Sequence, residues 1–124
     1  MTSHTATIDL YLRAYGEREQ TERDRLISAY FAPDAVLCDP PFIATGHAEL
    51  SGSFAAVQSQ FPDHHFERIT EVDEHHDVAR YGWTLVASDG TIAVAGTDIV
   101  TFNATGQIGS VAGFFGDVVA RNDR

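Results

Sequence analysis

The chain has 124 residues, 44% hydrophobic and 21% charged, which suits one soluble domain spanning 1–124 with a substantial core. Its formal net charge is −10 and all eight basic residues are Arg, without a basic run, so nucleic acid and anionic membranes are disfavoured as partners. A single cysteine excludes an internal disulfide framework, and no long apolar or signal-like segment occurs, so we expect a cytoplasmic protein.

Three apolar stretches with helical spacing lie in the first half of the chain. The first covers residues 8–15. The second begins at a capping-box pattern, Thr21 with Asp24, and ends before Pro33. The third covers residues 46–61 and ends at a proline. The pattern therefore predicts three helices.

Between the second and third helices lies FAPDAVLCDPPF, residues 31–42, an extended apolar stretch that ends in a carboxylate. Pro40 and Pro41 cannot donate to a sheet ladder, so the strand must stop at Asp39. Asp39 is then either an ordinary turn acceptor or a carboxylate held at the mouth of a cavity by a stiff backbone. Cys38 alternates to the opposite face and is expected to be a small buried apolar group.

The second half of the chain is predicted to be strands at 64–72, 78–87, 91–102 and 107–119, separated by short polar turns. Short turns between successive strands imply antiparallel neighbours. Helices followed by such a meander predict an α+β fold, with the helices packed on one face of a curved antiparallel sheet.

Strand alternation places Asp98 on the same face as the larger apolar side chains of its strand, among them Val94 and Val100. Burial there raises the pKa of a carboxyl group, and a neutral carboxylic acid can donate a hydrogen bond. In the next strand, Val111 shares a face with Gly113, which leaves room for either a packed helix or an open pocket. Asp98 and Asp39 are thus two carboxylates in different surroundings, and such a pair is suited to acid/base chemistry.

The histidines do not predict a metal site. His64 and His65 are adjacent on a predicted strand, point to opposite faces and cannot both bind one ion. One of them could instead carry a proton in the pocket. No pair of histidines has helical metal-ligand spacing, so we expect neither a metal nor another cofactor.

Eight short motifs occur in a fixed order along nearly the whole chain: YLRAY, FAPDAVLCDP, TGHAEL, FPDHHF, RYGWTL, GTDIVTF, NATG and GFFGD. In this order they resemble the NTF2-like superfamily, in its SnoaL-like and ketosteroid-isomerase-like branch. The resemblance implies a cone-shaped α+β fold, with N-terminal helices and a curved sheet around a deep pocket. It also implies a homodimer.

The resemblance to ketosteroid isomerases implies roles for individual residues. Asp39 matches their general base, while Tyr11 and a protonated Asp98 match their two oxyanion donors. In the SnoaL-like cyclases, which this chain resembles at GTDIVTF, the essential acid/base aspartate also falls on Asp98. Epoxide hydrolases of the superfamily have Arg two residues earlier, where this chain has Gly96, which disfavours that reaction.

We therefore expect a cofactor-independent acid/base enzyme acting on a hydrophobic, carbonyl-bearing small molecule. The reaction would be a ketosteroid-isomerase-like isomerisation or a polyketide-cyclase-like reaction. The side chains expected to bind substrate are Tyr15, Phe31, His64, Trp83, Val111 and Phe115. Three alternatives stay open: Asp98 acts alone and Asp39 is structural, Tyr11 is only a core aromatic, or the domain is a non-catalytic binding or dimerisation module.

Overall fold

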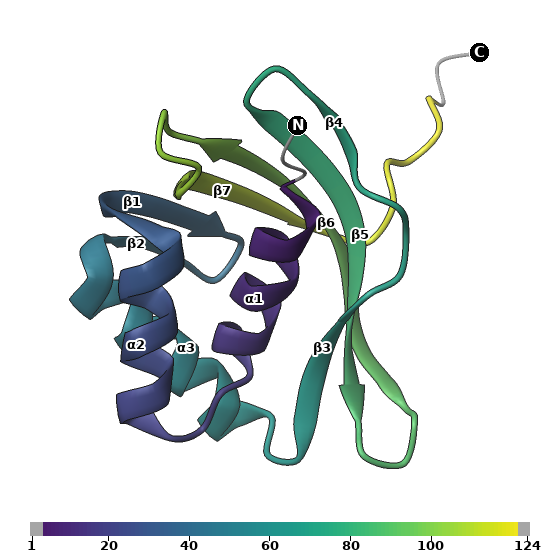
Figure 1. Ribbon diagram of the computed structural model, residues 1–124. Coiled ribbons are helices and arrows are strands. Elements are labelled where there is room, and N and C mark those ends of the chain that lie inside the picture. The colour runs from purple at the N-terminus through teal and green to yellow at the C-terminus, as the bar shows by residue number, and fades with distance from the viewer. Residues whose placement is uncertain (1–3, 122–124) are drawn as a thin grey trace.

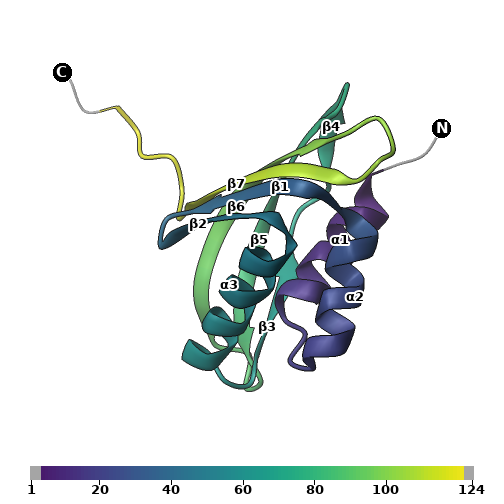
Figure 2. The same ribbon diagram turned by 90° about the vertical axis from the view of Figure 1, so that its left-hand side faces the viewer.

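Three helices pack against the concave face of one curved sheet, in a computed structural model that describes residues 4–121 (Figure 1). The helices are α1 (Thr5–Tyr15), α2 (Gln20–Tyr30) and α3 (Gly46–Gln60). The strands are β1 (Phe31–Asp39), β2 (Phe42–Thr45), β3 (His64–Arg68), β4 (Asp73–His75), β5 (Val78–Ala87), β6 (Ile92–Phe102) and β7 (Ile108–Phe115). Figure 2 shows the sheet arching over the helices. The expected α+β class is confirmed, and no helix within 4–121 is both long and apolar enough to cross a membrane.

The helices lie where the apolar spacing predicts them, but their first turns are capped differently. The N-cap of α2 is Glu19, whose side chain accepts a hydrogen bond from the Glu22 N–H at 3.0 Å, so the predicted capping box of Thr21 with Asp24 is wrong. At the start of α3, Glu49 Oε1 accepts from the Thr45 N–H at 2.8 Å. Glutamate side chains therefore satisfy free backbone donors at the starts of α2 and α3.

The sheet has the strand order β2-β1-β7-β6-β5-β3, and β4 pairs with β5 outside this path. The predicted antiparallel meander is confirmed for β5, β6 and β7. The sheet is nevertheless mixed, because β1 runs parallel to β7. Short turns predict pairing only between strands that follow one another in sequence. Because β1 and β7 are far apart along the chain, the turns could not predict this parallel pair.

The strand β1 ends in a stiff hairpin that fixes the position of Asp39. Pro40 and Pro41 form a two-residue turn into β2, and Asp39 lies opposite Phe42 in the antiparallel register. Proline restricts the backbone at both turn positions, so the end of β1 has little freedom. The hairpin therefore holds the Asp39 carboxylate in a nearly fixed position at the end of β1.

The core lies between the helices and the sheet, around Phe54 of α3. The rings of Tyr11 and Phe31 meet edge to face with centroids 5.4 Å apart, and both lie near Phe54. All three side chains are almost inaccessible to solvent. Burying each contributes about 2–3 kcal/mol, which holds α1 firmly against the sheet.

The outer face of the sheet carries Cys38, which is exposed. The expectation that this cysteine is a buried apolar group is therefore wrong. Strand alternation turns it away from the helices, as expected, but no described segment covers that face of β1 (Figure 2).

Candidate functional site

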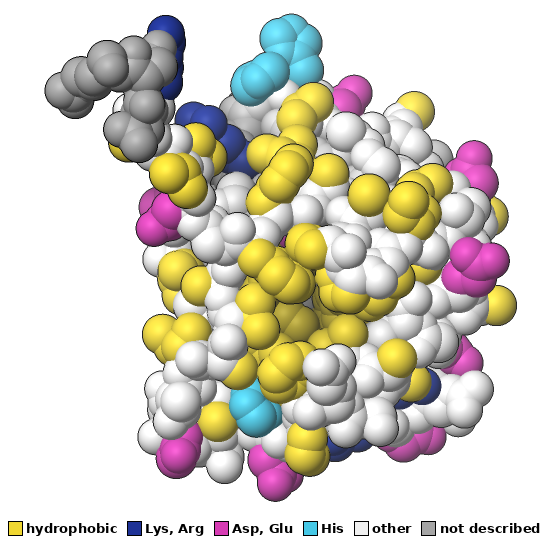
Figure 3. Space-filling model, turned by 180° about the vertical axis from the view of Figure 1, so that it is seen from behind, with side chains coloured by type: hydrophobic (Ala, Val, Ile, Leu, Met, Phe, Trp, Pro, Cys, Tyr) yellow, Lys and Arg dark blue, Asp and Glu magenta, His cyan; other side chains and the backbone are white. Residues whose placement is uncertain are grey.

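A cavity of about 290 Å³ lies between α1, α3 and the concave face of the sheet. Figure 3 shows its mouth as a hollow surrounded by hydrophobic side chains, on the face behind the view of Figure 1. The described residues that line it are Tyr11, Leu12, Tyr15, Asp39, Pro41, Val57, Gln60, Phe61, Phe66, Trp83, Leu85, Val94, Asp98 and Phe115. The lining is thus mostly apolar and aromatic, with two carboxyl groups and no Arg, Lys or His among these residues.

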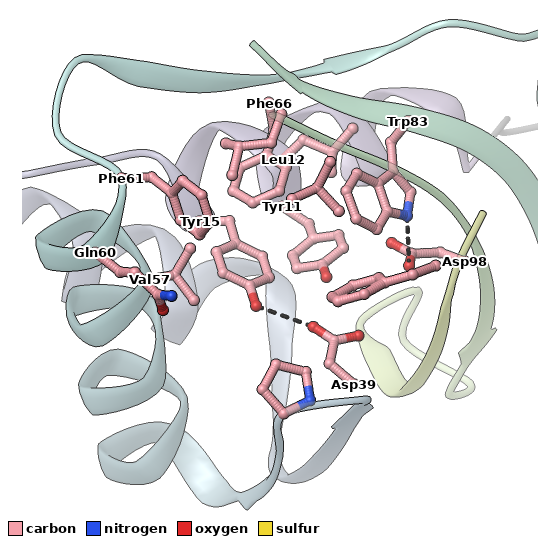
Figure 4. Close-up of a pocket in the computed structure, with 14 residues that line it drawn as sticks. Tyr11, Leu12, Tyr15, Asp39, Val57, Gln60, Phe61, Phe66, Trp83 and Asp98 are labelled. Carbon is pink, nitrogen blue, oxygen red and sulfur yellow. Dashed lines mark hydrogen bonds between the residues drawn. The ribbon is translucent and has the colours of Figure 1, made fainter. Parts of the chain in front are cut away.

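Asp98 occupies the middle of β6 and faces the cavity. It pairs with Tyr81 across the β5–β6 ladder, and the Tyr81 hydroxyl donates to Asp98 Oδ2 at 2.8 Å. Trp83, two residues further along the same face of β5, donates its indole N–H to Asp98 Oδ1 at 2.9 Å (Figure 4). Only 3% of Asp98 is exposed, so these two donors hold a deeply buried carboxyl group in one orientation.

The pKa of Asp98 is raised to about 7, chiefly by burial and in smaller part by the negative charge of Asp39. The hydrogen bonds from Tyr81 and Trp83 act in the opposite direction because they favour the ionised form, but burial outweighs them. Asp98 therefore exchanges its proton in the range where a general acid or base is most effective at neutral pH.

Asp39 reaches the same cavity from the end of β1. Its Oδ2 atom accepts a hydrogen bond from the Tyr15 hydroxyl at 2.9 Å (Figure 4). Its Oδ1 atom is buried and has no hydrogen-bond partner within residues 4–121. Burial raises the pKa of Asp39, and the hydrogen bond from Tyr15 partly offsets that shift.

Tyr15 is held in place from three sides. Its ring stacks on Phe54 with centroids 4.2 Å apart and lies against Phe66 at 4.5 Å. Buried Gln58 of α3 donates its side-chain N–H to the Tyr15 backbone carbonyl at 2.7 Å. Burial and the neighbouring Asp39 raise the pKa of Tyr15, so its hydroxyl stays protonated and available as a donor.

Tyr11 lies one helical turn before Tyr15 on α1 and lines the same cavity. Figure 4 shows its hydroxyl directed toward the space shared by Asp39 and Asp98. Burial raises the pKa of Tyr11, and the charge of Asp98 adds to the shift. The Tyr11 hydroxyl is therefore a neutral donor beside both carboxyl groups.

Gly96 creates the space that Trp83 needs. A Cβ atom on Gly96 would overlap the indole ring of Trp83 and the backbone carbonyl of Phe114. The missing side chain lets the indole lie across β6 with its N–H aimed at Asp98. At this position, where the sequence comparison expects arginine in epoxide hydrolases, the chain has glycine because a side chain would overlap Trp83.

The three residues expected to be catalytic, Asp39, Asp98 and Tyr11, all line one cavity. Of the residues expected to bind substrate, Tyr15, Trp83 and Phe115 line it as well.

The other three expected substrate-binding residues lie elsewhere. Phe31 and Val111 are buried in the packed core and are not among the lining residues. His64 lies at the start of β3, where its Nδ1 atom is 2.7 Å from the Pro62 carbonyl oxygen and its ring is near Phe61. None of these three side chains therefore lines the cavity.

Three hydrogen bonds of the site were not anticipated from the sequence, two to Asp98 and one to the backbone of Tyr15. Strand alternation put Tyr81 on the same face as Trp83, but only the sheet register shows that both donate to Asp98. Gln58 lies at helical spacing from the apolar Phe54, but nothing in the sequence shows that it donates to the Tyr15 carbonyl. Among the described residues, no group of three or more His, Cys, Asp or Glu side chains could hold a metal ion.

The chain matches the family model of the SnoaL-like domain over residues 11–111. It belongs to the SnoaL-like family. The matched segment begins at Tyr11 and ends at Val111, so it includes both carboxylates of the cavity. No curated protein matches the chain significantly.

Solved structures share the same fold over almost the whole chain. A SnoaL-like protein from Agrobacterium tumefaciens C58, provisionally named an isomerase, is 29% identical, with a TM-score of 0.88 and coverage of 94% of this chain and 100% of that one. A protein from Sinorhizobium meliloti, provisionally named a polyketide cyclase, is 19% identical, with a TM-score of 0.70 and coverage of 91% and 100%. An NTF2-like protein of unknown function from Exiguobacterium sp. 255-15 is 24% identical, with a TM-score of 0.68 and coverage of 90% and 99%. The fold is therefore NTF2-like, and the family resemblance drawn from the sequence motifs is confirmed.

Proposed function

We propose that the protein is a cofactor-independent enzyme that removes a proton from carbon next to a carbonyl group of a hydrophobic small molecule. Asp39 is the general base, and Asp98 in its protonated form and Tyr11 donate hydrogen bonds to the oxygen that becomes negative. The isomerase and cyclase names of the two related structures fit this chemistry, because both reaction types can start from an enolate.

The observation that carries the proposal is the convergence of Asp39, Asp98 and Tyr11 on one apolar cavity (Figure 4). The three side chains come from β1, β6 and α1, so their meeting is not a consequence of sequence proximity. Their differing surroundings separate the roles: Asp98 is only 3% exposed and has a pKa raised to about 7, while Asp39 is half-buried.

In the proposed reaction, the carbonyl oxygen of the substrate accepts hydrogen bonds from Tyr11 and Asp98. Asp39 Oδ2, oriented by Tyr15, takes the proton from the adjacent carbon and leaves an enolate. In an isomerisation, the same carboxyl returns the proton to another carbon of the conjugated system. In a cyclisation, the enolate carbon instead attacks a second carbonyl, whose C=O π bond breaks, and the new alkoxide takes up the proton held by Asp39, which regenerates the base.

A second candidate role assignment follows from the deeper burial of Asp98. Because its pKa lies near 7 and two donors fix its position, Asp98 alone could serve as the acid/base group, with Asp39 structural. Separate substitution of each carboxyl group distinguishes the two assignments.

The test is hydrogen–deuterium exchange at the carbon next to the carbonyl, followed by proton NMR in D₂O. The cavity of about 290 Å³ is at the small end of ligand pockets, so one- and two-ring cyclic enones are the first panel. We expect the wild-type protein to accelerate exchange in at least one of them, and Asp39→Asn to lower that rate by about 100-fold or more. The matched control is Asp34→Asn, which alters an exposed carboxylate on the same strand and should leave the rate unchanged.

Planar naphthols, which resemble an enolate, provide the accompanying binding assay. Trp83, the single tryptophan of the chain, lines the cavity and reports binding through its fluorescence. Naphthol binding without any exchange activity would favour a non-catalytic binding module. Exchange that survives Asp39→Asn but is lost in Asp98→Asn would favour the second assignment.

A further inference from the structure

Gly113 of β7 lies between the two aspartates of the cavity in the sheet. It pairs with Asp98 across the β6–β7 ladder. On its other side β1 runs parallel to β7, and the last residues paired there are Cys38 and Ala112. Asp39 and Gly113 each come one residue later, so neighbouring strands bring Asp39, Gly113 and Asp98 next to one another. The middle residue of these three has no side chain.

The carboxyl group of Asp39 fills the space that a side chain at position 113 would need. A Cβ atom on Gly113 would overlap Asp39 Oδ1 and lie 3.2 Å from Asp39 Cγ, and it would also lie 3.0 Å from Asp98 Oδ1. Gly109 of the same strand differs, because a Cβ atom there would lie 3.7 Å from Thr101 Oγ1, an ordinary contact. Any residue other than glycine at position 113 would therefore compete with the Asp39 carboxyl group for the same space.

Two contacts fix the orientation of the Asp39 carboxyl group. Its Oδ1 atom lies against Gly113, is buried and accepts no hydrogen bond from any residue within 4–121. Its Oδ2 atom accepts from the Tyr15 hydroxyl at 2.9 Å. Because Oδ1 is shielded from solvent, Oδ2 is the oxygen through which Asp39 can meet a substrate. Gly113 and Tyr15 therefore decide together which oxygen faces the cavity.

The backbone of Asp39 has little freedom to move if a methyl group is added at position 113. Asp39 is followed directly by the turn of Pro40 and Pro41, which restricts the chain at both positions. The methyl group is therefore accommodated by rotation of the Asp39 side chain about its own bonds. The carboxyl group is planar and rigid, so a rotation that moves Oδ1 away from position 113 also moves Oδ2 away from the Tyr15 hydroxyl.

We propose that Gly113 is the positioning residue of the general base. Its missing side chain lets the Asp39 carboxyl group lie against β7, with Oδ1 enclosed and Oδ2 available to the reacting carbon. Gly113 is not among the residues that line the cavity, so it acts through Asp39 and not on the substrate. The inference rests on the proposed function for the identity of the base, and it adds the residue that determines where the base lies.

The first experiment combines crystal structures of Gly113→Ala and Gly109→Ala with their exchange rates per folded protein. In Gly113→Ala we expect the Asp39 carboxyl group to lie out of hydrogen-bond reach of Tyr15, and kcat to fall about 100-fold, because a misplacement of about 1 Å can cost that much. Gly109→Ala should keep both the hydrogen bond and the rate. The proposal is overturned if the Asp39–Tyr15 hydrogen bond persists in Gly113→Ala, or if the carboxyl group moves and the rate does not change.

A double-mutant cycle with Asp39→Ala provides a second measurement that needs no activity. Asp39→Ala removes the carboxyl group from the contested space, so Gly113→Ala should destabilise the protein less in that background than in the wild type. Urea unfolding of the four proteins measures this coupling. If Gly113→Ala alone does not fold, the double variant should still fold. Absence of coupling, or a double variant that also fails to fold, would mean that the conflict is not with Asp39 and would overturn the proposal.

These measurements distinguish failure of the positioning role from failure of the proposed function. If the wild-type protein exchanges no proton of any enone, the proposed function fails, and the role of Gly113 in catalysis fails with it, while the crystal structures and the cycle still establish whether Gly113 places Asp39. If exchange depends on Asp39 but Gly113→Ala keeps the wild-type rate, only the role of Gly113 is overturned.

Discussion

The middle of β6 and the end of β1 each place an aspartate carboxyl group in the same cavity, but the surroundings of the two groups differ. At the middle of β6, Asp98 is enclosed by sheet neighbours, and its two oxygens receive donors from the adjacent strand. At the end of β1, Asp39 is half-buried and depends on a diproline turn and on Tyr15 from a helix. The difference shows how a sheet interior can raise the pKa of one carboxyl group through burial, while a strand end leaves another partly exposed.

The largest expected effect concerns the pH dependence of stability, and it should be dominated by Asp98. Its pKa in the folded protein, about 7, lies well above the unfolded value, so the folded state binds more protons between about pH 4 and pH 7. The free energy of unfolding should therefore fall as pH rises through this range, by about 4 kcal/mol from this group. Urea unfolding between pH 4.5 and 8 should show this slope in the wild type and a flatter one in Asp98→Asn.

Asp34→Asn, which changes an exposed carboxylate, should keep the wild-type slope. Asp39→Asn should reduce the slope less than Asp98→Asn, because Asp39 is only half-buried. Equal slopes in the wild type and in Asp98→Asn would contradict the view that Asp98 is the more strongly perturbed group.

Removing the tyrosine hydroxyl that donates to each carboxyl group should further distinguish the surroundings of Asp98 from those of Asp39. Tyr81→Phe leaves fully buried Asp98 with one donor fewer and should cost about 1–3 kcal/mol at pH 8, while Tyr15→Phe should cost about 1 kcal/mol. Each change removes a hydrogen bond that favours the ionised form, so each should raise the pKa of its own carboxyl group. Urea unfolding and carboxyl NMR titration measure both effects.

Tyr30→Phe is the control for this pair, because half-buried Tyr30 does not line the cavity. The comparison fails if Tyr15→Phe proves more destabilising than Tyr81→Phe, or if Tyr81→Phe moves the titration of Asp39 more than that of Asp98.

Gln58→Leu should affect Asp39 and its partner Tyr15 more than Asp98. It removes the donor to the Tyr15 backbone carbonyl and should cost about 1 kcal/mol. Because Tyr15 orients Asp39, the exchange rate should fall while the titration of Asp98 remains close to that of the wild type. Gln20→Leu, an exposed glutamine at the start of α2, is the control. A larger change at Asp98 than at Asp39 would contradict this arrangement.

The smallest effect is expected on the outer face of the sheet, one residue away from Asp39. Cys38 is exposed and points away from the cavity, so Cys38→Ser should change stability by less than about 0.5 kcal/mol. The exchange rate should also be unchanged. A large loss of activity in Cys38→Ser would show that the end of β1 is less rigid than its diproline turn implies.

The sequence by itself determined the helices, the meander of β5, β6 and β7, and the family, because apolar periodicity, short turns and ordered motifs are local signals. It also singled out Asp98, since alternation along one strand is enough to place a carboxylate on an apolar face. It could not show the parallel pairing of β1 with β7, nor that the outer face carrying Cys38 is uncovered, because these depend on which distant segments meet.

Only the tertiary structure decided how the site is assembled. The approach of Asp39 to Asp98 depends on strands β1, β6 and β7 lying next to one another and on the absence of a side chain at Gly113. Tyr15 and Tyr81 became partners of the two carboxylates through packing that no local pattern encodes. A residue's chemical type is written in the sequence, but its partners and its degree of burial, which set its pKa, arise only when distant segments pack together.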